Sequence, residues 1–237
     1  MEKREQLYEG KAKIIYRTDD ENKYIAFFKD DATAFNGKKS GTIQSKGIFN
    51  NKISSKIFEE ISKKEIPTHY IETLSDREML VKKVEIILVE VVIRNIVAGS
   101  MARRMGVEEG MELPNTIIDL HYKDDDLDDP LINEDTAIGF NLASKEELEI
   151  MRKYALEINN FLKDFFSSKN IDLVDFKLEF GRCPSENNQI ILADEITPDS
   201  CRFWEKGTGR KIDKDRFRHD LGNIEDAYAE IEKLVIE

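Results

Sequence analysis

The octet from Val174 to Gly181 constrains the fold more than any other stretch, because apolar and charged residues alternate along it. Successive side chains of a β-strand point to opposite faces. One face of the predicted strand is apolar and belongs in a core: Val174, Phe176, Leu178 and Phe180. The other face carries an acid, a base and an acid: Asp175, Lys177 and Glu179. We therefore expect a strand with one buried face and one charged face.

A second predicted strand, residues 189–195, follows after a polar connection of hairpin length. Its alternation places Asp194 at the end of the strand. If the two strands pair, a carboxylate from each converges on one point, where a hard cation such as Mg²⁺ would sit. The alternative is a solvated face with cross-strand ion pairs. The loop at 194–202 favours the first interpretation, because acids, small hydroxyls and an arginine suit a phosphate and metal site.

The composition predicts a soluble globular protein of one large domain or two small domains that share a cleft. The chain has 237 residues, of which 40% are hydrophobic and 35% are charged. No apolar run approaches the ~20 residues of a membrane span, and the N-terminus lacks the apolar core of a signal peptide. We expect no membrane association and a cytoplasmic location, with Cys183 and Cys201 as reduced thiols.

The net charge of −12 argues against a nucleic-acid partner, which requires a broad basic surface. Small phosphorylated ligands remain possible where the cations cluster. The segment Gly10 to Lys13 combines a glycine with two lysines, and Arg94 stands where a buried apolar run stops, shortly before Ser100. Both patterns suit phosphate binding. Their alternatives are solvated lysines and an arginine paired with an acid at a strand end.

The chain divides near 84–88 into a β-rich part, 1–85, and a larger α+β part, 86–237. In the first part we predict strands at 7–8, 12–16, 24–28, 69–74 and 79–84, a loop at 38–47 and a helix at 48–61. In the second part we predict strands at 86–93 and 117–122, the strand pair, and helices at 96–105, after the capping box at Ser144, and at about 213–235.

Five ordered motifs resemble those of the SAICAR synthetase family over nearly the whole chain. They are Gly-Lys-Ala-Lys at 10–13, Asp-Ala-Thr-Ala-Phe at 31–35, Arg-Asn and Ala-Gly-Ser within 93–100, the strand at 175–181, and Asp-Glu-Ile-Thr-Pro-Asp-Ser-Cys-Arg-Phe-Trp at 194–204. The resemblance implies a two-lobed α+β fold akin to ATP-grasp enzymes and protein kinases, with a small antiparallel β N-terminal lobe on a larger mixed lobe. It also implies an ATP-dependent ligase of purine biosynthesis that joins L-aspartate to the ribotide CAIR to give SAICAR, ADP and phosphate, with Mg²⁺.

The resemblance also implies roles for individual residues. Gly10, Lys11, Ala12 and Lys13 would cover the ATP phosphates, Lys82 and Ile86 would border the adenine, and Lys123 would lie at the nucleotide. Glu179, Asp194 and Asp129 match the metal acids. Arg94, Ser100 and Arg202 match residues that hold the ribotide phosphate, with Asp175 and Lys177 along the same ligand. The expected catalytic set is Asp175, Lys177, Glu179 and Asp194.

Other expectations concern the remaining substrate and the assembly. Asn36 stands where some family members carry aspartate, so it receives no metal role. Lys38, Lys39 and Ser40 are candidates for the L-aspartate site, and the loop at 182–188 is expected to carry no chemistry. The resemblance implies a homodimer whose ligands are small molecules.

Two other functions use the same features. A small-molecule kinase could use the same lysines and Mg²⁺ acids, but it would release a phosphorylated product without an amine. A nucleotide-sensing module without turnover would be expected to lose a metal acid, yet Glu179 and Asp194 are both present.

Overall fold

The alternating octet lies within β11 (Ile171–Cys183), the longest strand and the one with the most partners. The computed structural model describes residues 1–34 and 39–237. β11 pairs antiparallel with three other strands of a six-stranded sheet, in which the order is β10-β9-β8-β11-β12 and β13 also pairs with β11. The other five strands of this sheet are β8 (Glu85–Ile96), β9 (Glu112–Tyr122), β10 (Leu131–Ile132), β12 (Gln189–Ala193) and β13 (Cys201–Glu205), of which β8, β12 and β13 pair with β11.

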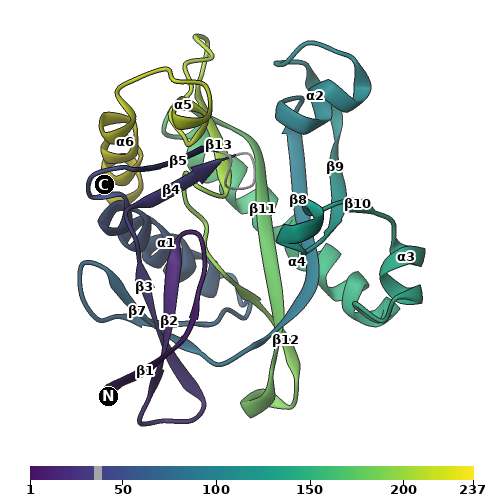
Figure 1. Ribbon diagram of the computed structural model, residues 1–237. Helices are drawn as coiled ribbons and strands as arrows, with labels where there is room; N and C mark the ends of the chain where they lie inside the picture. The colour runs from purple at the N-terminus through teal and green to yellow at the C-terminus, as the bar shows by residue number, and fades with distance from the viewer. Residues whose placement is uncertain (35–38) are drawn as a thin grey trace.

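A second antiparallel sheet is built from the N-terminal part of the chain, in the order β1-β2-β3-β7-β6. Its strands are β1 (Lys3–Glu9), β2 (Lys13–Thr18), β3 (Lys23–Phe28), β6 (Tyr70–Thr73) and β7 (Glu78–Lys82). A separate hairpin joins β4 (Asp31–Ala34) to β5 (Lys39–Thr42). Figure 1 shows the two sheets side by side, with the chain passing from one to the other between β7 and β8.

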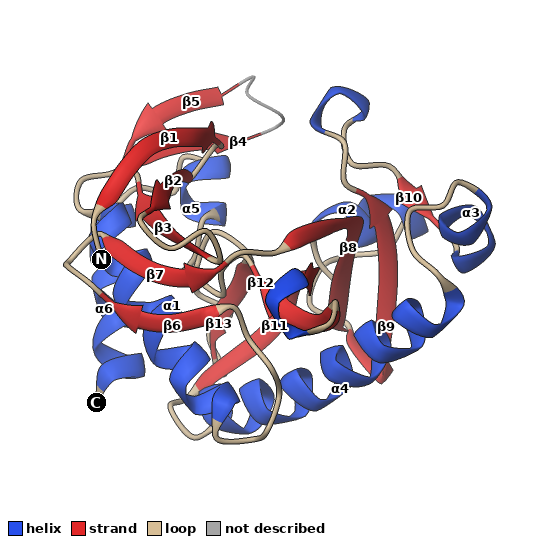
Figure 2. Cartoon of the chain, turned by 90° about the horizontal axis from the view of Figure 1, so that it is seen from below, coloured by secondary structure: helices blue, strands red, loops and turns tan. Residues whose placement is uncertain are grey.

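Two long helices cover the sheets and are predicted by their apolar spacing. α1 (Lys46–Ser62) packs on the N-terminal sheet, and α4 (Lys145–Ser167) runs along the larger sheet (Figure 2). The capping box is confirmed: the Ser144 hydroxyl accepts from the Glu147 backbone N–H at 3.2 Å, and the Glu147 carboxylate accepts from the Ser144 N–H at 2.8 Å.

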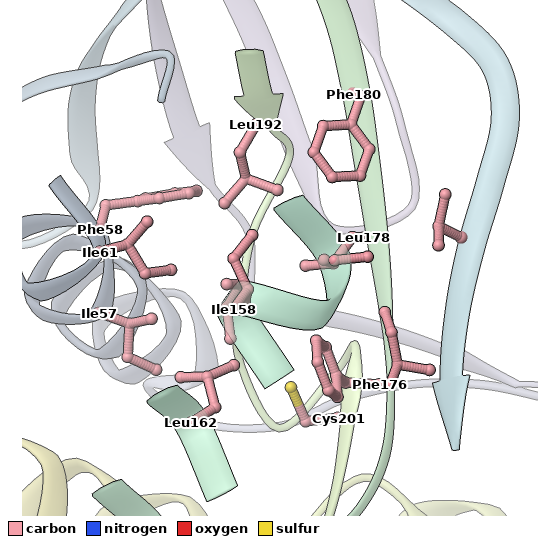
Figure 3. Close-up of a cluster of buried hydrophobic side chains, with 14 of the residues drawn as sticks. Ile57, Phe58, Ile61, Ile158, Leu162, Phe176, Leu178, Phe180, Leu192 and Cys201 are labelled. Atoms are coloured by element: carbon pink, nitrogen blue, oxygen red, sulfur yellow. The ribbon is translucent and has the colours of Figure 1, made fainter. Parts of the chain in front are cut away.

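One hydrophobic core connects these layers. Figure 3 shows Phe176, Leu178 and Phe180 of β11 facing side chains of α1 and α4. Those helix residues are Ile57, Phe58 and Ile61 of α1 and Ile158 and Leu162 of α4. The apolar face of the octet is buried as predicted, and its charged face points away from this core. Because the same core includes residues of both sheets, the division at 84–88 stays a prediction.

The C-terminal segment differs from the expected single helix. It forms a short helix, α5 (Asp215–Arg218), and then α6 (Ile224–Ile236), which packs on α1. Between them Gly222 has φ +69°, a conformation that glycine adopts without a steric penalty. The Arg216 side chain donates to the carbonyl of Gly222 at 2.7 Å and stabilises the break. Leu221, which lies within the predicted helix at about 213–235, is 47% exposed.

Other elements also begin or end at residues different from those predicted. β8 stays paired with β9 as far as Ile96, which lies opposite Glu112. The next helix, α2 (Gly99–Met105), therefore begins later than the predicted residue 96. Part of the predicted loop at 38–47 is β5, and α3 (Glu134–Gly139) was not predicted. Short 3₁₀ turns occupy Asp125–Leu127 and Pro184–Glu186. No helix among the described residues is long and apolar enough to span a membrane.

Candidate functional site

A cavity of about 470 Å³ is lined by residues from both sheets and contains most of the predicted nucleotide and metal residues. Those residues are Gly10, Lys11, Ala12, Lys13, Lys82, Ile86, Lys123, Asp129, Lys177, Glu179 and Asp194. Apolar side chains, among them Val81, Ile86 and Leu88, also form part of the wall. A wall of this mixed character suits a ligand with a flat apolar ring and a charged tail.

The register of β11 and β12 brings the two predicted metal acids to the cavity. Glu179 pairs with Ala193, and Asp194 follows directly at the end of the strand with φ +59°. Lys177 Nζ is hydrogen-bonded to Glu179 and lies 3.8 Å from Asp194 Oδ2. The expected pairing of the strands is therefore confirmed, and both carboxylates lie within reach of one amine.

Lysines surround these acids and balance their charge. Lys13 Nζ is hydrogen-bonded to Asp194, Lys123 Nζ lies 2.9 Å from Glu179 Oε1, and Lys177 Nζ donates to Glu90 at 2.8 Å. Burial opposes the charged form of Lys177, but Glu179 and Asp194 outweigh it and raise the lysine pKa well above its ordinary value. Burial likewise opposes ionisation of Asp194, yet Lys13 and Lys177 hold the pKa of its carboxyl below its ordinary value.

Glu179 and Asp194 suit a divalent cation that also binds the phosphates of a substrate. No group of three or more His, Cys, Asp or Glu side chains in the described ranges is arranged to hold a metal ion by itself. Mg²⁺ is usually held by one or two carboxylates together with substrate phosphates, which matches Glu179 and Asp194. Asp129 lies on the same cavity wall, but its Oδ1 accepts from the Asp124 backbone N–H at 3.0 Å. Its metal role stays a prediction.

The glycine-lysine segment lies in the turn between β1 and β2. The Gly10 N–H donates to the Lys13 carbonyl at 2.8 Å, which closes the turn over the cavity. Lys11 Nζ reaches Asp125 at 2.7 Å, and Lys13 points to Asp194. Lys11 in the turn and Lys13 at the start of β2 therefore reach acids that follow strands of the larger sheet, Asp125 after β9 and Asp194 after β12.

The predicted ribotide residues form a second cluster, outside the residues that line the cavity. Arg94 donates to Asp175 at 3.4 Å and to the Ser100 hydroxyl at 3.3 Å, and Arg202 donates to Asp175 at 2.8 and 3.0 Å. A Cβ on Gly99 would lie 2.5 Å from Arg202, so only glycine lets the chain approach the guanidinium this closely. The four residues Arg94, Ser100, Asp175 and Arg202 are therefore brought together.

Arg94 also satisfies the alternative interpretation, since its Nε donates to Asp119 at 2.7 Å and only 2% of the residue is exposed. Arg202 is more accessible, at 17% of its side chain. Asp175 holds both arginines and is 4% exposed. Its position indicates that it orients the arginines within the cluster.

Several predicted residues lie elsewhere or beyond the described ranges. Lys39 pairs with Asp220 at 2.6 Å, and Ser40 is on the exposed strand β5. Lys82 does line the cavity, but its amine pairs with Glu186 at 2.7 Å. Asn36 and Lys38, together with Phe35 of the second motif, lie outside the described residues.

The sequence analysis missed other polar residues at the cavity. His69 is 7% exposed, and burial lowers its pKa to about 3, so its ring is neutral. Glu195 is buried next to Asp194, and burial raises the pKa of its carboxyl. Glu90, Asp199 and Lys214 also line the wall. One of these residues had a signal in the sequence, because Glu90 is a charged residue inside an apolar strand pattern.

Comparison with known proteins places the whole chain in one family. A SAICAR synthetase family model matches residues 6–235. A phosphoribosylaminoimidazole-succinocarboxamide synthase of Thermoanaerobacter sp. (strain X514) is 57% identical over 233 residues, 98% of each chain. The crystal structure of the synthase from Ehrlichia chaffeensis has a TM-score of 0.95 at 45% identity, covering 98% of both chains. A SAICAR synthetase in complex with ADP has a TM-score of 0.93 at 44% identity, covering 98% of this chain and 97% of the other. The chain therefore belongs to the SAICAR synthetase family.

Proposed function

We propose that the cavity between the two sheets is the place where this SAICAR synthetase joins L-aspartate to the carboxylate of CAIR, releasing ADP and phosphate. The observation that carries this assignment is the placement of Glu179 and Asp194 beside Lys13, Lys123 and Lys177 in one cavity. The related SAICAR synthetase that was solved with ADP supports a nucleotide as the ligand.

The chemistry requires this concentration of charge. A carboxylate is a poor electrophile, so amide formation in water requires its activation by phosphoryl transfer. An oxygen of the CAIR carboxylate attacks the γ-phosphorus of ATP, and the bond from that phosphorus to the β,γ-bridging oxygen breaks to release ADP. The amine of aspartate then attacks the carbonyl carbon and loses a proton. Phosphate leaves with the oxygen that came from the carboxylate.

Residues at different positions in the cavity and in the arginine cluster would have different roles in this reaction. Lys11 and Lys13 would hold the nucleotide phosphates, and Lys177 would balance negative charge where the phosphoryl group moves. The apolar wall near Ile86 would receive the adenine, with Lys82 and Lys123 beside the nucleotide. Glu179 and Asp194 would hold Mg²⁺, which when bound neutralises charge on the phosphates. The arginine cluster would hold the ribotide phosphate.

A ligase and a small-molecule kinase differ in their need for an amine, and the family membership favours the ligase. The test is release of ADP in the presence of ATP, Mg²⁺ and CAIR, measured with and without L-aspartate. We expect sustained ADP release only with L-aspartate, in equal amount to SAICAR. ADP release at the same rate without aspartate, together with a stable phosphorylated product, would establish the kinase instead.

The two basic clusters should differ in the substrate that they bind. Lys13→Ala should weaken ATP binding, whereas Arg202→Ala should weaken CAIR binding. Loss of a charge-assisted hydrogen bond costs about 1.5–3 kcal/mol, so each affinity should fall roughly tenfold or more. Calorimetric titration of each variant with both ligands measures this. If Arg202→Ala weakens ATP alone, the two pockets are assigned in reverse.

Two further proposals concern the setting of the enzyme. We infer a cytoplasmic location, which the family's place in purine biosynthesis supports, as do the two buried free thiols Cys183 and Cys201. A homodimer is proposed from the family resemblance, and sedimentation of the purified chain measures it.

A further inference from the structure

Lys214 differs from every other lysine of the cavity in its contacts. Six lysines line the cavity among the described residues, and five of them have a carboxylate oxygen within 2.9 Å: Lys11, Lys13, Lys82, Lys123 and Lys177. The nearest carboxylate oxygen to Lys214 Nζ is Asp199 Oδ2 at 3.7 Å, and within the described ranges this amine makes no hydrogen bond. Its side chain is only 11% exposed.

Asp199 takes its hydrogen bonds from other residues, although the charge of Lys214 also helps to hold the pKa of its carboxyl below the ordinary value. Lys46 donates to Asp199 Oδ2 at 2.6 Å, and the Tyr228 hydroxyl donates to Oδ1 at 2.5 Å. Both oxygens of the buried carboxylate are therefore already bonded, and Lys46 balances its charge. Lys214 therefore lies near Asp199 as a second buried cation that has no hydrogen bond to it. Burial lowers its pKa, and although Asp199 and Glu195 oppose this, the neighbouring charges of Lys46 and Arg218 add to the lowering. An anion beside the amine would stabilise its charged form and raise its pKa.

Lys214 lines the cavity and is adjacent in sequence to a residue that contacts the ribotide cluster. Its backbone N–H donates to the Pro198 carbonyl at 3.1 Å, in the loop that follows the metal acid Asp194. The next residue, Asp215, accepts from Arg202 of the ribotide cluster at 2.9 Å. The bond between the two organic substrates must form between these regions, so the amino acid must bind beside both.

Two of the residues that the sequence predicts to bind L-aspartate, Lys39 and Ser40, belong to β5. This strand lies against α5, the helix that begins directly after Lys214. Phe217 of α5 packs on Gly41 of β5, and Lys39 Nζ lies 5.0 Å above the Phe217 ring. Lys39 itself is bound to Asp220 at the surface. Lys214 directly precedes α5, and within the described ranges its amine makes no hydrogen bond.

We propose that Lys214 binds a carboxylate of the amino-acid substrate and so contributes to selection of a dicarboxylic amino acid. This inference rests on the proposed function. Its direct test compares CAIR, which lacks the aspartate carboxylates, with SAICAR, which keeps both. In calorimetric titrations Lys214→Met should weaken SAICAR binding about tenfold or more, with CAIR binding changed less than about threefold. Lys214→Arg, which keeps the charge, should recover most of the SAICAR affinity.

The matched control is Lys46→Met, which removes the other cation at Asp199 but does not line the cavity. Equal weakening of CAIR and SAICAR by Lys214→Met, no weakening of either, or the same selective loss in Lys46→Met would each overturn the inference. In the supporting case the KM for L-aspartate also rises about tenfold or more in Lys214→Met, while the KM for ATP stays near the wild-type value. If the wild-type chain binds neither CAIR nor SAICAR, the proposed function itself fails, which separates the two failures.

Discussion

Replacing Glu179 by Gln, or Asp194 by Asn, should lower kcat/KM by about 100-fold or more, which corresponds to roughly 2.7 kcal/mol of transition-state stabilisation. Each replacement keeps the shape of the side chain but removes a charged oxygen that is proposed to bind Mg²⁺. Both carboxylates line the cavity and share Lys177, so the loss falls where the phosphoryl group is expected to move. Steady-state kinetics with saturating Mg²⁺ measures the effect.

The matched control is Glu205→Gln, which removes an acid that pairs with Arg210 outside the cavity. Its kcat/KM should remain within about threefold of wild type, because substitutions away from the substrate site have small effects. Circular dichroism and thermal unfolding must show that all three variants are folded. Near-normal activity in a folded Glu179→Gln or Asp194→Asn variant would remove that residue from the metal site.

Two neighbouring residues of β11 should respond in opposite ways to substitution. Phe176 is 1% exposed within the core, so Phe176→Ala should lower the free energy of unfolding by about 3–5 kcal/mol. Lys177 faces the cavity, so Lys177→Met should chiefly lower kcat, by about 100-fold or more, as expected for loss of a preorganised charge.

Urea unfolding and steady-state kinetics of both variants test this contrast. The activity of Phe176→Ala should be measured well below its unfolding midpoint, so that the folded fraction is known. A stable but inactive Phe176→Ala, together with a destabilised but active Lys177→Met, would mean that the faces of β11 are inverted.

The features that local patterning controls could be predicted from the sequence. The alternation at 174–181 gave the correct buried face, and Ser144 gave the correct start of α4. The pairing of β11 with β12 followed from the short polar connection and placed Asp194 beside Glu179. These predictions succeeded because strand periodicity and helix capping act over a few residues.

Features set by long-range contacts could not be predicted. The break between α5 and α6 depends on the Arg216 side chain reaching the Gly222 carbonyl, and the apolar spacing at 213–235 continues across it. The pairing of Lys46 with Asp199 joins residues 153 positions apart, so neither residue carried a signal by itself. The lack of a hydrogen-bonded acid at Lys214 among the described residues, in contrast to the other cavity lysines, likewise depends on long-range contacts that no local pattern encodes.

The fate of the carboxylate oxygen tests the central claim most directly. CAIR labelled with ¹⁸O in its carboxylate is converted in the presence of ATP, Mg²⁺ and L-aspartate, and the released inorganic phosphate is analysed by mass spectrometry. If the cavity activates the carboxylate by phosphoryl transfer, each phosphate carries one oxygen from CAIR, so the label appears in phosphate in proportion to the SAICAR formed. Unlabelled phosphate alongside normal SAICAR formation would contradict the acyl phosphate and the role proposed for the cavity.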